Sequence, residues 1–132
     1  MRTIDEAIEW GRGQVSSPSQ SWQGKCQTFV RSCDGVGAWA LTAYDAWLRI
    51  PAAHRSDAGS VHDAPRGAAL YFRHASGDPR PGHVVLATKS NCLSNDIYRK
   101  GMIDCAPRDI FASHWGMTYL GWSLWTPSGE VR

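Results

Sequence analysis

The stretch GKCQTFVRSC, residues 24–33, places Cys26 at the expected start of a helix. A helix N-terminus carries unpaired backbone N–H groups and the positive end of the helix dipole, and both favour the thiolate form of a cysteine. Lys25 adds a positive charge beside it. We therefore expect a nucleophilic Cys26 whose thiol pKa lies below the value of about 8.5 of a free cysteine.

A cysteine nucleophile needs a base that takes its proton. His83 is the candidate base, because it directly follows Pro81-Gly82 and is the first residue of an apolar, strand-like run. The alternative is a strand-end histidine that is satisfied by a backbone carbonyl. The remaining histidines lie in polar or turn-rich stretches or beside a Trp-Gly pair, and we interpret them as surface or packing residues: His54, His62, His74 and His114.

The imidazole in turn needs a group that orients it, and we expect that group on the strand that pairs with the His83 strand. Ser94-Asn95-Asp96 is the polar trio in such a strand. Alternation predicts Ser94 and Asp96 on one face and Asn95 on the other. Asp96 is the predicted third catalytic residue because its charge would stabilise an imidazolium, and Asn95 is the reserve. The alternative is that Asp96 caps the following turn.

The elements that would position these residues change in character along the chain. Helices are expected first: after the Thr3 N-cap to about Trp10, where Gly11 and Gly13 end it, then over Lys25–Ser32 and Trp39–Arg49. Strands are expected over 69–72, 83–88, 92–97 and 119–123, with a helical turn at 109–114 and a loop over 52–67. Helices followed by antiparallel strands are typical of the α+β class.

Composition and charge indicate the number of domains and exclude several kinds of partner and site. With 132 residues, 42% hydrophobic and 20% charged, we expect one domain over residues 1–132 and a monomer. A net charge of +2 gives no reason to expect a nucleic-acid partner. No apolar segment predicts a signal peptide or membrane insertion, so we expect synthesis in the cytoplasm and four reduced thiols. Cys33, Cys92 and Cys105 are interpreted as apolar fillers, and the cysteine spacings predict no metal site.

Four stretches, taken in order, resemble the CHAP family of cysteine- and histidine-dependent amidohydrolases/peptidases: GKCQTFVR, PRGAALYF, PGHVVLA and CLSNDI. This family belongs to the NlpC/P60 papain-like group. The run SNDIYRKGMIDCAPRDIFASHWGMTYLGWS further resembles cell-wall lysins of phages that infect actinobacteria. The resemblance covers residues 3 to 125. It implies a papain-like α+β fold in which N-terminal helices pack on a small antiparallel sheet.

The resemblance also implies roles for single residues. Cys26 matches the family nucleophile and His83 the family base, whereas many relatives have Glu or Asn where this chain has Ser94-Asn95-Asp96. An oxyanion hole would combine the Cys26 N–H with a side-chain amide, either Gln20, at the position used by papain-like enzymes, or Gln23. Either amide is alternatively a solvated loop residue. Among the tryptophans, we expect Trp22 foremost to face the substrate cleft, and most of the others to pack in the core: Trp39, Trp47, Trp115 and Trp122.

These expectations define a peptidoglycan hydrolase of the endolysin type, an amidase or endopeptidase that acts without a cofactor on the cell wall after release. Two alternatives stay open: an inactive wall-binding or virion structural module with the same fold, and an acyl transferase. The presence of both Cys26 and His83 argues against an inactive module, which would need neither residue.

Overall fold

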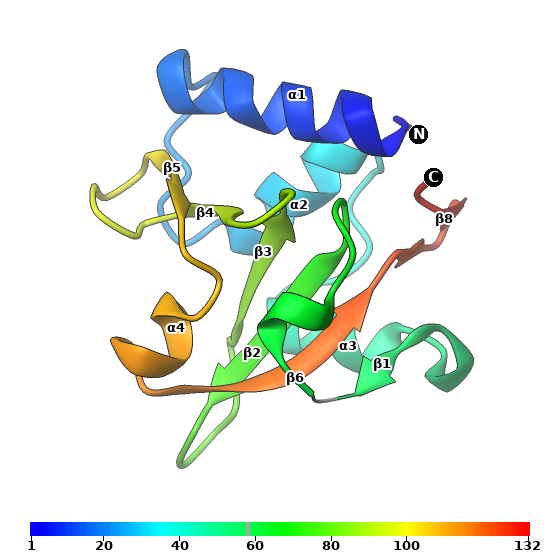
Figure 1. The fold of residues 1–132 in the computed structure, drawn as a ribbon, viewed down its shortest axis with the longest axis vertical. Coiled ribbons are helices and arrows are strands. Elements are labelled where there is room, and N and C mark those ends of the chain that lie inside the picture. The colour runs from blue at the N-terminus through cyan, green and yellow to red at the C-terminus, as the bar shows by residue number, and fades with distance from the viewer. Residues whose placement is uncertain (58) are drawn as a thin grey trace.

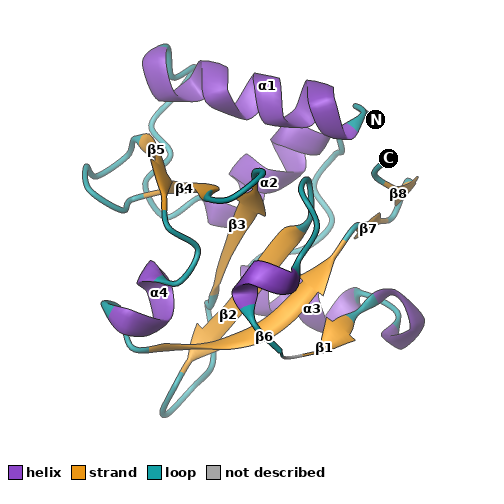
Figure 2. Ribbon diagram, in the orientation of Figure 1, coloured by secondary structure: helices purple, strands orange, loops and turns teal. Residues whose placement is uncertain are grey.

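The computed structural model describes residues 1–57 and 59–132, and within these residues the protein has an α+β fold (Figures 1 and 2). The helices are α1 (Ile4–Ser16), α2 (Cys26–Asp34), α3 (Ala43–Arg49) and α4 (Ile110–Ser113), with 3-10 turns at Ala52–His54 and Val61–Asp63. The main sheet has the order β1-β6-β2-β3-β4-β5 and all its pairs are antiparallel. Its strands are β1 (Ser56–Asp57), β2 (Ala69–His74), β3 (His83–Ala87), β4 (Cys92–Asn95), β5 (Ile103–Ala106) and β6 (Met117–Ser123). A second ribbon pairs β7 (Trp125–Thr126) with β8 (Gly129–Glu130).

Helix α1 begins as predicted but ends six residues later. Thr3 and Glu6 form the expected capping box. The helix continues through Gly11 to Ser16, so the prediction that the glycines end it near Trp10 was wrong. A Cβ atom at Gly11 would lie 3.0 Å from the Leu93 side chain and 3.1 Å from the Cys33 sulfur. Gly11 therefore allows close packing of α1 rather than ending it.

Helix α3 is shorter than predicted. It begins at Ala43 rather than Trp39, because the Thr42 hydroxyl accepts a hydrogen bond from the Asp45 N–H and caps the helix there. Helix α2 runs over Cys26–Asp34, close to the predicted range, and Gly35 ends it in the left-handed conformation.

The strands agree with the predicted pattern except at their ends. The segment 52–67, predicted as a loop, contains the 3-10 turns and β1, and β5 was not predicted. Strand β4 stops at Asn95, two residues before the predicted end, because Asp96 adopts a positive φ of 58°. Alternation along β4 therefore does not reach Asp96.

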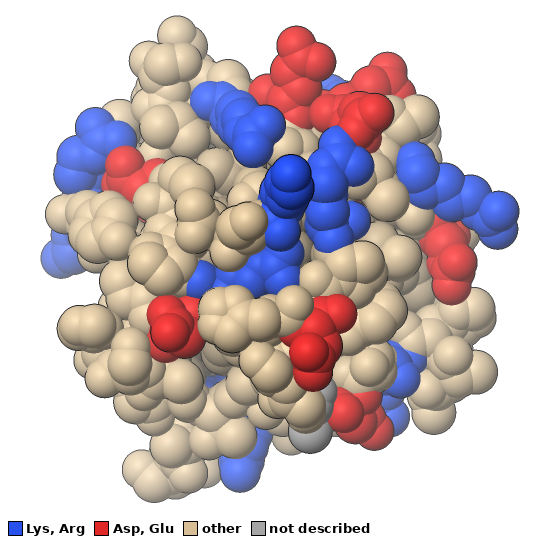
Figure 3. Space-filling model, in the orientation of Figure 1, with Lys and Arg blue, Asp and Glu red and all other residues tan. Residues whose placement is uncertain are grey.

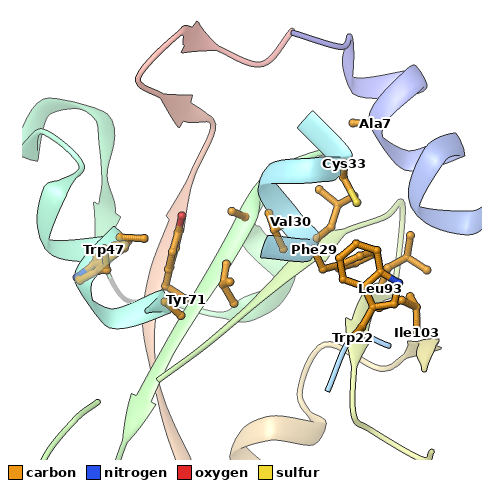
Figure 4. Close-up of a cluster of buried hydrophobic side chains, with 14 of the residues drawn as sticks. Ala7, Trp22, Phe29, Val30, Cys33, Trp47, Tyr71, Leu93 and Ile103 are labelled. Atoms are coloured by element: carbon orange, nitrogen blue, oxygen red, sulfur yellow. The ribbon is translucent and has the colours of Figure 1, made fainter. Parts of the chain in front are cut away.

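The sheet separates two hydrophobic clusters. The first lies between the sheet and helices α1, α2 and α3, and Figure 4 shows its centre, where Trp22, Phe29, Leu93 and Ile103 pack together. The second lies on the other face, under α4 and the 3-10 turn at Val61–Asp63. Successive residues of β3 and β4 contribute alternately to the two clusters.

The ends of the chain lie side by side (Figure 1), and the Ile4 N–H donates to the Arg132 carbonyl at 2.9 Å. Basic and acidic side chains are interspersed on the face in Figure 3. Within residues 1–57 and 59–132, no helix is long and apolar enough to cross a membrane. The same residues contain no cluster of three or more His, Cys, Asp or Glu side chains suited to hold a metal ion.

Candidate active site

Cys26 is the first residue of α2, and its side chain is partly exposed. The backbone N–H groups of Val84, Gln27 and Cys26 itself favour the thiolate, and each lowers the pKa of the thiol. Burial of the thiol has the larger effect and raises the pKa, as does the negative charge of Asp96. The predicted helix-start environment is present, but the expected low pKa is not, because desolvation disfavours the thiolate more than the N–H groups favour it.

His83 is the first residue of β3 and is 6% exposed. Gly82 precedes it with a φ of 73°, and a Cβ there would lie 2.7 Å from the Phe72 carbonyl oxygen. Only a glycine fits this close approach, as the Gly-His pair in the sequence suggested. Burial lowers the pKa of His83 to about 4, although the Asp96 charge raises it. The imidazole is therefore neutral at pH 7.

Both predicted catalytic residues lie near the start of β3. Because the Val84 backbone N–H lowers the pKa of the Cys26 thiol, the sulfur lies near the peptide group that joins His83 to Val84. The imidazole packs on the side of the second cluster, with its ring centre 4.9 Å from that of Phe111. The thiol packs against the first cluster. No hydrogen bond joins the sulfur to the imidazole among the described residues, and neither group is among the causes of the other's pKa shift.

The imidazole is held by Ser94, not by Asp96. The His83 Nε2 and Ser94 Oγ atoms lie 2.7 Å apart, and the Ser94 hydroxyl donates to the Asn95 carbonyl at 3.0 Å. Ser94 is completely buried. The sequence contained Ser94 in its polar trio, but Asp96 was predicted because its charge would stabilise an imidazolium, with Asn95 as the reserve.

Asp96 instead holds the loop that leads to the nucleophile. Its Oδ2 accepts from the Gly24 N–H at 2.8 Å, and its Oδ1 accepts from the Gly101 N–H at 2.6 Å. Asn95 lies on the opposite face of β4 from Ser94, as alternation predicted, and its amide donates to the Trp22 carbonyl and to Asp96. Neither side chain hydrogen-bonds to His83, so the predicted contact between Asp96 and the imidazole is absent from the described residues, whereas the alternative of a capping role for Asp96 agrees with its contacts.

Of the two predicted oxyanion donors, Gln20 has a fixed partner. Both Gln20 and Gln23 are exposed in the loop before Cys26. The Gln20 Oε1 accepts from the Lys25 Nζ at 2.9 Å, which leaves its NH2 group as the end that can donate to a ligand.

Trp22 does not face a cleft, contrary to the prediction. It is 1% exposed, and its ring packs edge-on against Phe29 (Figure 4). The ring also packs edge-on against Trp10, and its Nε1 donates to the Gln14 Oε1 at 3.2 Å. Its large apolar ring is buried in the core, where its single N–H also has a hydrogen-bond partner.

Trp115 is the tryptophan that lies at the site. It is 39% exposed, and its ring centre is 5.0 Å from that of His83. Phe111 packs edge-on against it at 5.1 Å. An exposed aromatic ring against the candidate base offers a surface on which a ligand can pack.

Comparison of the chain with protein-family models, with curated proteins and with solved structures finds no match.

Proposed function

We propose that this protein is a cysteine-dependent peptidoglycan hydrolase that cleaves an amide bond, with a fold of the papain-like NlpC/P60 type. The observation that carries the proposal is the position of the Cys26 thiol, at the N-terminus of α2 and beside the first peptide group of the His83 strand. Acyl transfer through a thioester needs a cysteine nucleophile and a base that takes its proton, and Cys26 and His83 supply these two residue types near one another. The resemblance of the sequence to the CHAP family supplies the substrate class.

In the proposed reaction, the neutral His83 takes the proton of Cys26 as the sulfur attacks the carbonyl carbon of the amide. The C–N bond then breaks, and the leaving amine takes that proton from the imidazolium. A water molecule next attacks the thioester and gives a proton to His83, the C–S bond breaks, and the thiolate regains the proton. The products are a carboxylate and an amine.

Backbone N–H groups at the start of α2 are available to stabilise the negative charge that develops on the carbonyl oxygen. We assign the side-chain donor to the Gln20 amide, because Lys25 occupies its oxygen and leaves its NH2 group able to donate. In this proposal the protein acts on the bacterial cell wall after release, as endolysins do, and needs no cofactor.

The test is digestion of purified peptidoglycan from an actinobacterium, followed by mass spectrometry of the new termini. We expect new amino and carboxyl groups at one type of amide bond. Release of lactoyl-linked carboxylates would identify a muramoyl amidase, and new termini within the peptides would identify an endopeptidase. Unchanged peptidoglycan with folded protein would contradict the proposal.

Cysteine variants provide the matched control. Cys26→Ser is expected to abolish cleavage and to leave the circular dichroism spectrum unchanged. Cys105→Ser replaces an exposed thiol on β5 and is expected to keep full activity. Cleavage by Cys26→Ser at a rate comparable with the original protein would rule out the thioester mechanism.

A further inference from the structure

We propose that Ser94 is the positioning residue of the site: its hydroxyl passes a hydrogen bond from His83 to the Asn95 carbonyl and thereby keeps the His83 proton on Nε2. This inference rests on the proposed function for its consequence in catalysis. The hydrogen-bond chain itself exists whether or not the protein is a hydrolase.

The proton assignment follows from counting donors. A serine hydroxyl has one hydrogen, and the Ser94 hydroxyl donates it to the Asn95 carbonyl at 3.0 Å. Its oxygen can then only accept from His83, whose Nε2 lies 2.7 Å away. Nε2 must therefore carry the hydrogen in this arrangement.

The other tautomer loses one of these hydrogen bonds. If Nε2 lacked a hydrogen, the Ser94 hydroxyl would have to turn toward it and release the Asn95 carbonyl. Ser94 is completely buried and His83 nearly so, and water is thus poorly placed to replace the lost bond. Buried polar groups left without a partner are unfavourable, which favours the tautomer with two hydrogen bonds.

The consequence is a base that is ready to act. With its hydrogen on Nε2, the neutral His83 has a free lone pair on Nδ1, which is the atom that must accept the Cys26 proton. The opposite tautomer would present an N–H to the thiol and would not be able to take its proton. Ser94 therefore does what a carboxylate or amide does in other cysteine hydrolases, without bringing a charge into the core.

Nuclear magnetic resonance tests the tautomer without any substrate. In protein with 15N-labelled histidines at pH 7, we expect His83 to show a protonated Nε2 and an unprotonated Nδ1. The signals are assigned by their loss in His83→Gln. A His83 with its hydrogen on Nδ1 in the unmodified protein would overturn the proposal, and this result does not depend on whether peptidoglycan is cleaved.

Three variants test the positioning role. Ser94→Ala should mix the two tautomers of His83 and lower kcat about tenfold with little change in KM. Ser94→Thr keeps the hydroxyl and should restore the single tautomer and the original kcat. Ser123→Ala is the control, because Ser123 is also a buried serine that donates to a carbonyl, that of His54, far from the site. An unchanged tautomer and turnover in folded Ser94→Ala would overturn the role of Ser94.

The iodoacetamide reaction of Cys26 gives a second readout that needs no peptidoglycan. In a Cys105→Ser background, Ser94→Ala should slow alkylation of Cys26 at pH 7, because less of the His83 population can take the thiol proton. If alkylation slows but no peptidoglycan is cleaved by the unmodified protein, the proposed function fails and the role of Ser94 stands. Equal alkylation rates in the two proteins would contradict the role of Ser94 in preparing the base.

Discussion

The resting state of the two central residues is a neutral pair. Burial raises the pKa of the Cys26 thiol and lowers the pKa of the His83 imidazole to about 4, so the thiol keeps its proton and the imidazole lacks one at pH 7. A thiolate–imidazolium pair would require the opposite shifts. His83 is therefore expected to act as a general base during attack rather than as the standing partner of a thiolate.

This pair predicts a wide pH range for catalysis. Activity should fall only when His83 becomes protonated, so the acidic limb of kcat/KM should lie near pH 4 instead of near the ordinary histidine value of 6.5. Initial rates at constant ionic strength, with circular dichroism at each pH to confirm folding, would measure it. An acidic limb near pH 6.5 would mean that the imidazole is solvated in the working enzyme.

Trp115 gives a second prediction for a single side chain. Because its ring is exposed and packs against His83, we expect it to contact the substrate rather than the reacting atoms. Trp115→Ala should raise KM several-fold, and Trp115→Phe should recover most of the affinity because the aromatic surface is kept. Leu41→Ala, which alters an exposed apolar side chain in the segment before α3, is the control. An unchanged KM in Trp115→Ala would exclude Trp115 from the binding surface.

At the scale of elements, the turn after β4 and the loop before α2 form one unit. Asp96 binds the backbone N–H groups of Gly24 and Gly101, and the Asn95 amide binds the Trp22 carbonyl. The Trp22 N–H donates in turn to the Gly101 carbonyl at 2.9 Å. The loop that carries the nucleophile is therefore fixed by the end of the strand that also carries Ser94.

Asp96→Asn tests this connection. The amide replaces one acceptor oxygen by an NH2 group that faces a backbone N–H, so one hydrogen bond is lost, and we expect unfolding free energy to fall by about 1–3 kcal/mol. Turnover should fall as well, because the loop before Cys26 loosens. Urea unfolding and initial rates measure the two effects, with Asp78→Asn in an exposed turn as the control. Reduced turnover at full stability would instead support the predicted role of Asp96 in orienting the imidazole.

Local signals in the sequence were sufficient to predict two helix starts, whereas features that depend on long-range contacts were not predicted. The capping box at Thr3 and the helix start at Cys26 depend on neighbours in sequence, and both were predicted. The positive φ of Asp96 depends on N–H groups that are 72 and 5 residues away, and it shortened β4 and removed Asp96 from the His83 side of the strand. The burial of Trp22 likewise depends on α1.

At the scale of the whole molecule, two buried ionisable side chains have opposite effects on how the free energy of unfolding changes with pH. Burial raises the pKa of Asp34, at the end of α2, to about 7, although the Arg2 charge lowers it. The Asp34 Oδ1 atom has no hydrogen-bond partner within the described part of the chain. Burial lowers the pKa of His83, at the start of β3, to about 4.

The signs of the two contributions follow from which state binds more protons. The folded protein keeps a proton on Asp34 that the unfolded chain loses. The contribution of Asp34 to the free energy of unfolding is therefore fully present below about pH 4 and is lost as pH rises to about 7. As pH falls, His83 is protonated in the unfolded chain before it is protonated in the folded protein. The contribution of His83 to the free energy of unfolding is therefore fully present above about pH 6.5 and is lost as pH falls to about 4. Between pH 4 and 6.5 the two slopes therefore oppose each other.

Single variants should separate the effects of Asp34 and His83 on the pH dependence of the unfolding free energy. Asp34→Asn removes the first group, so relative to the original protein its unfolding free energy should increase with pH between 4 and 7, by at most about 1.4 kcal/mol per pH unit. His83→Gln should show the reverse difference between pH 6.5 and 4. Urea unfolding at half-unit pH steps measures both, and an exposed substitution, Asp78→Asn, serves as the control. Parallel pH profiles for Asp34→Asn and the original protein would mean that Asp34 is ionised in the fold, which requires water or a cation beside its unpartnered oxygen.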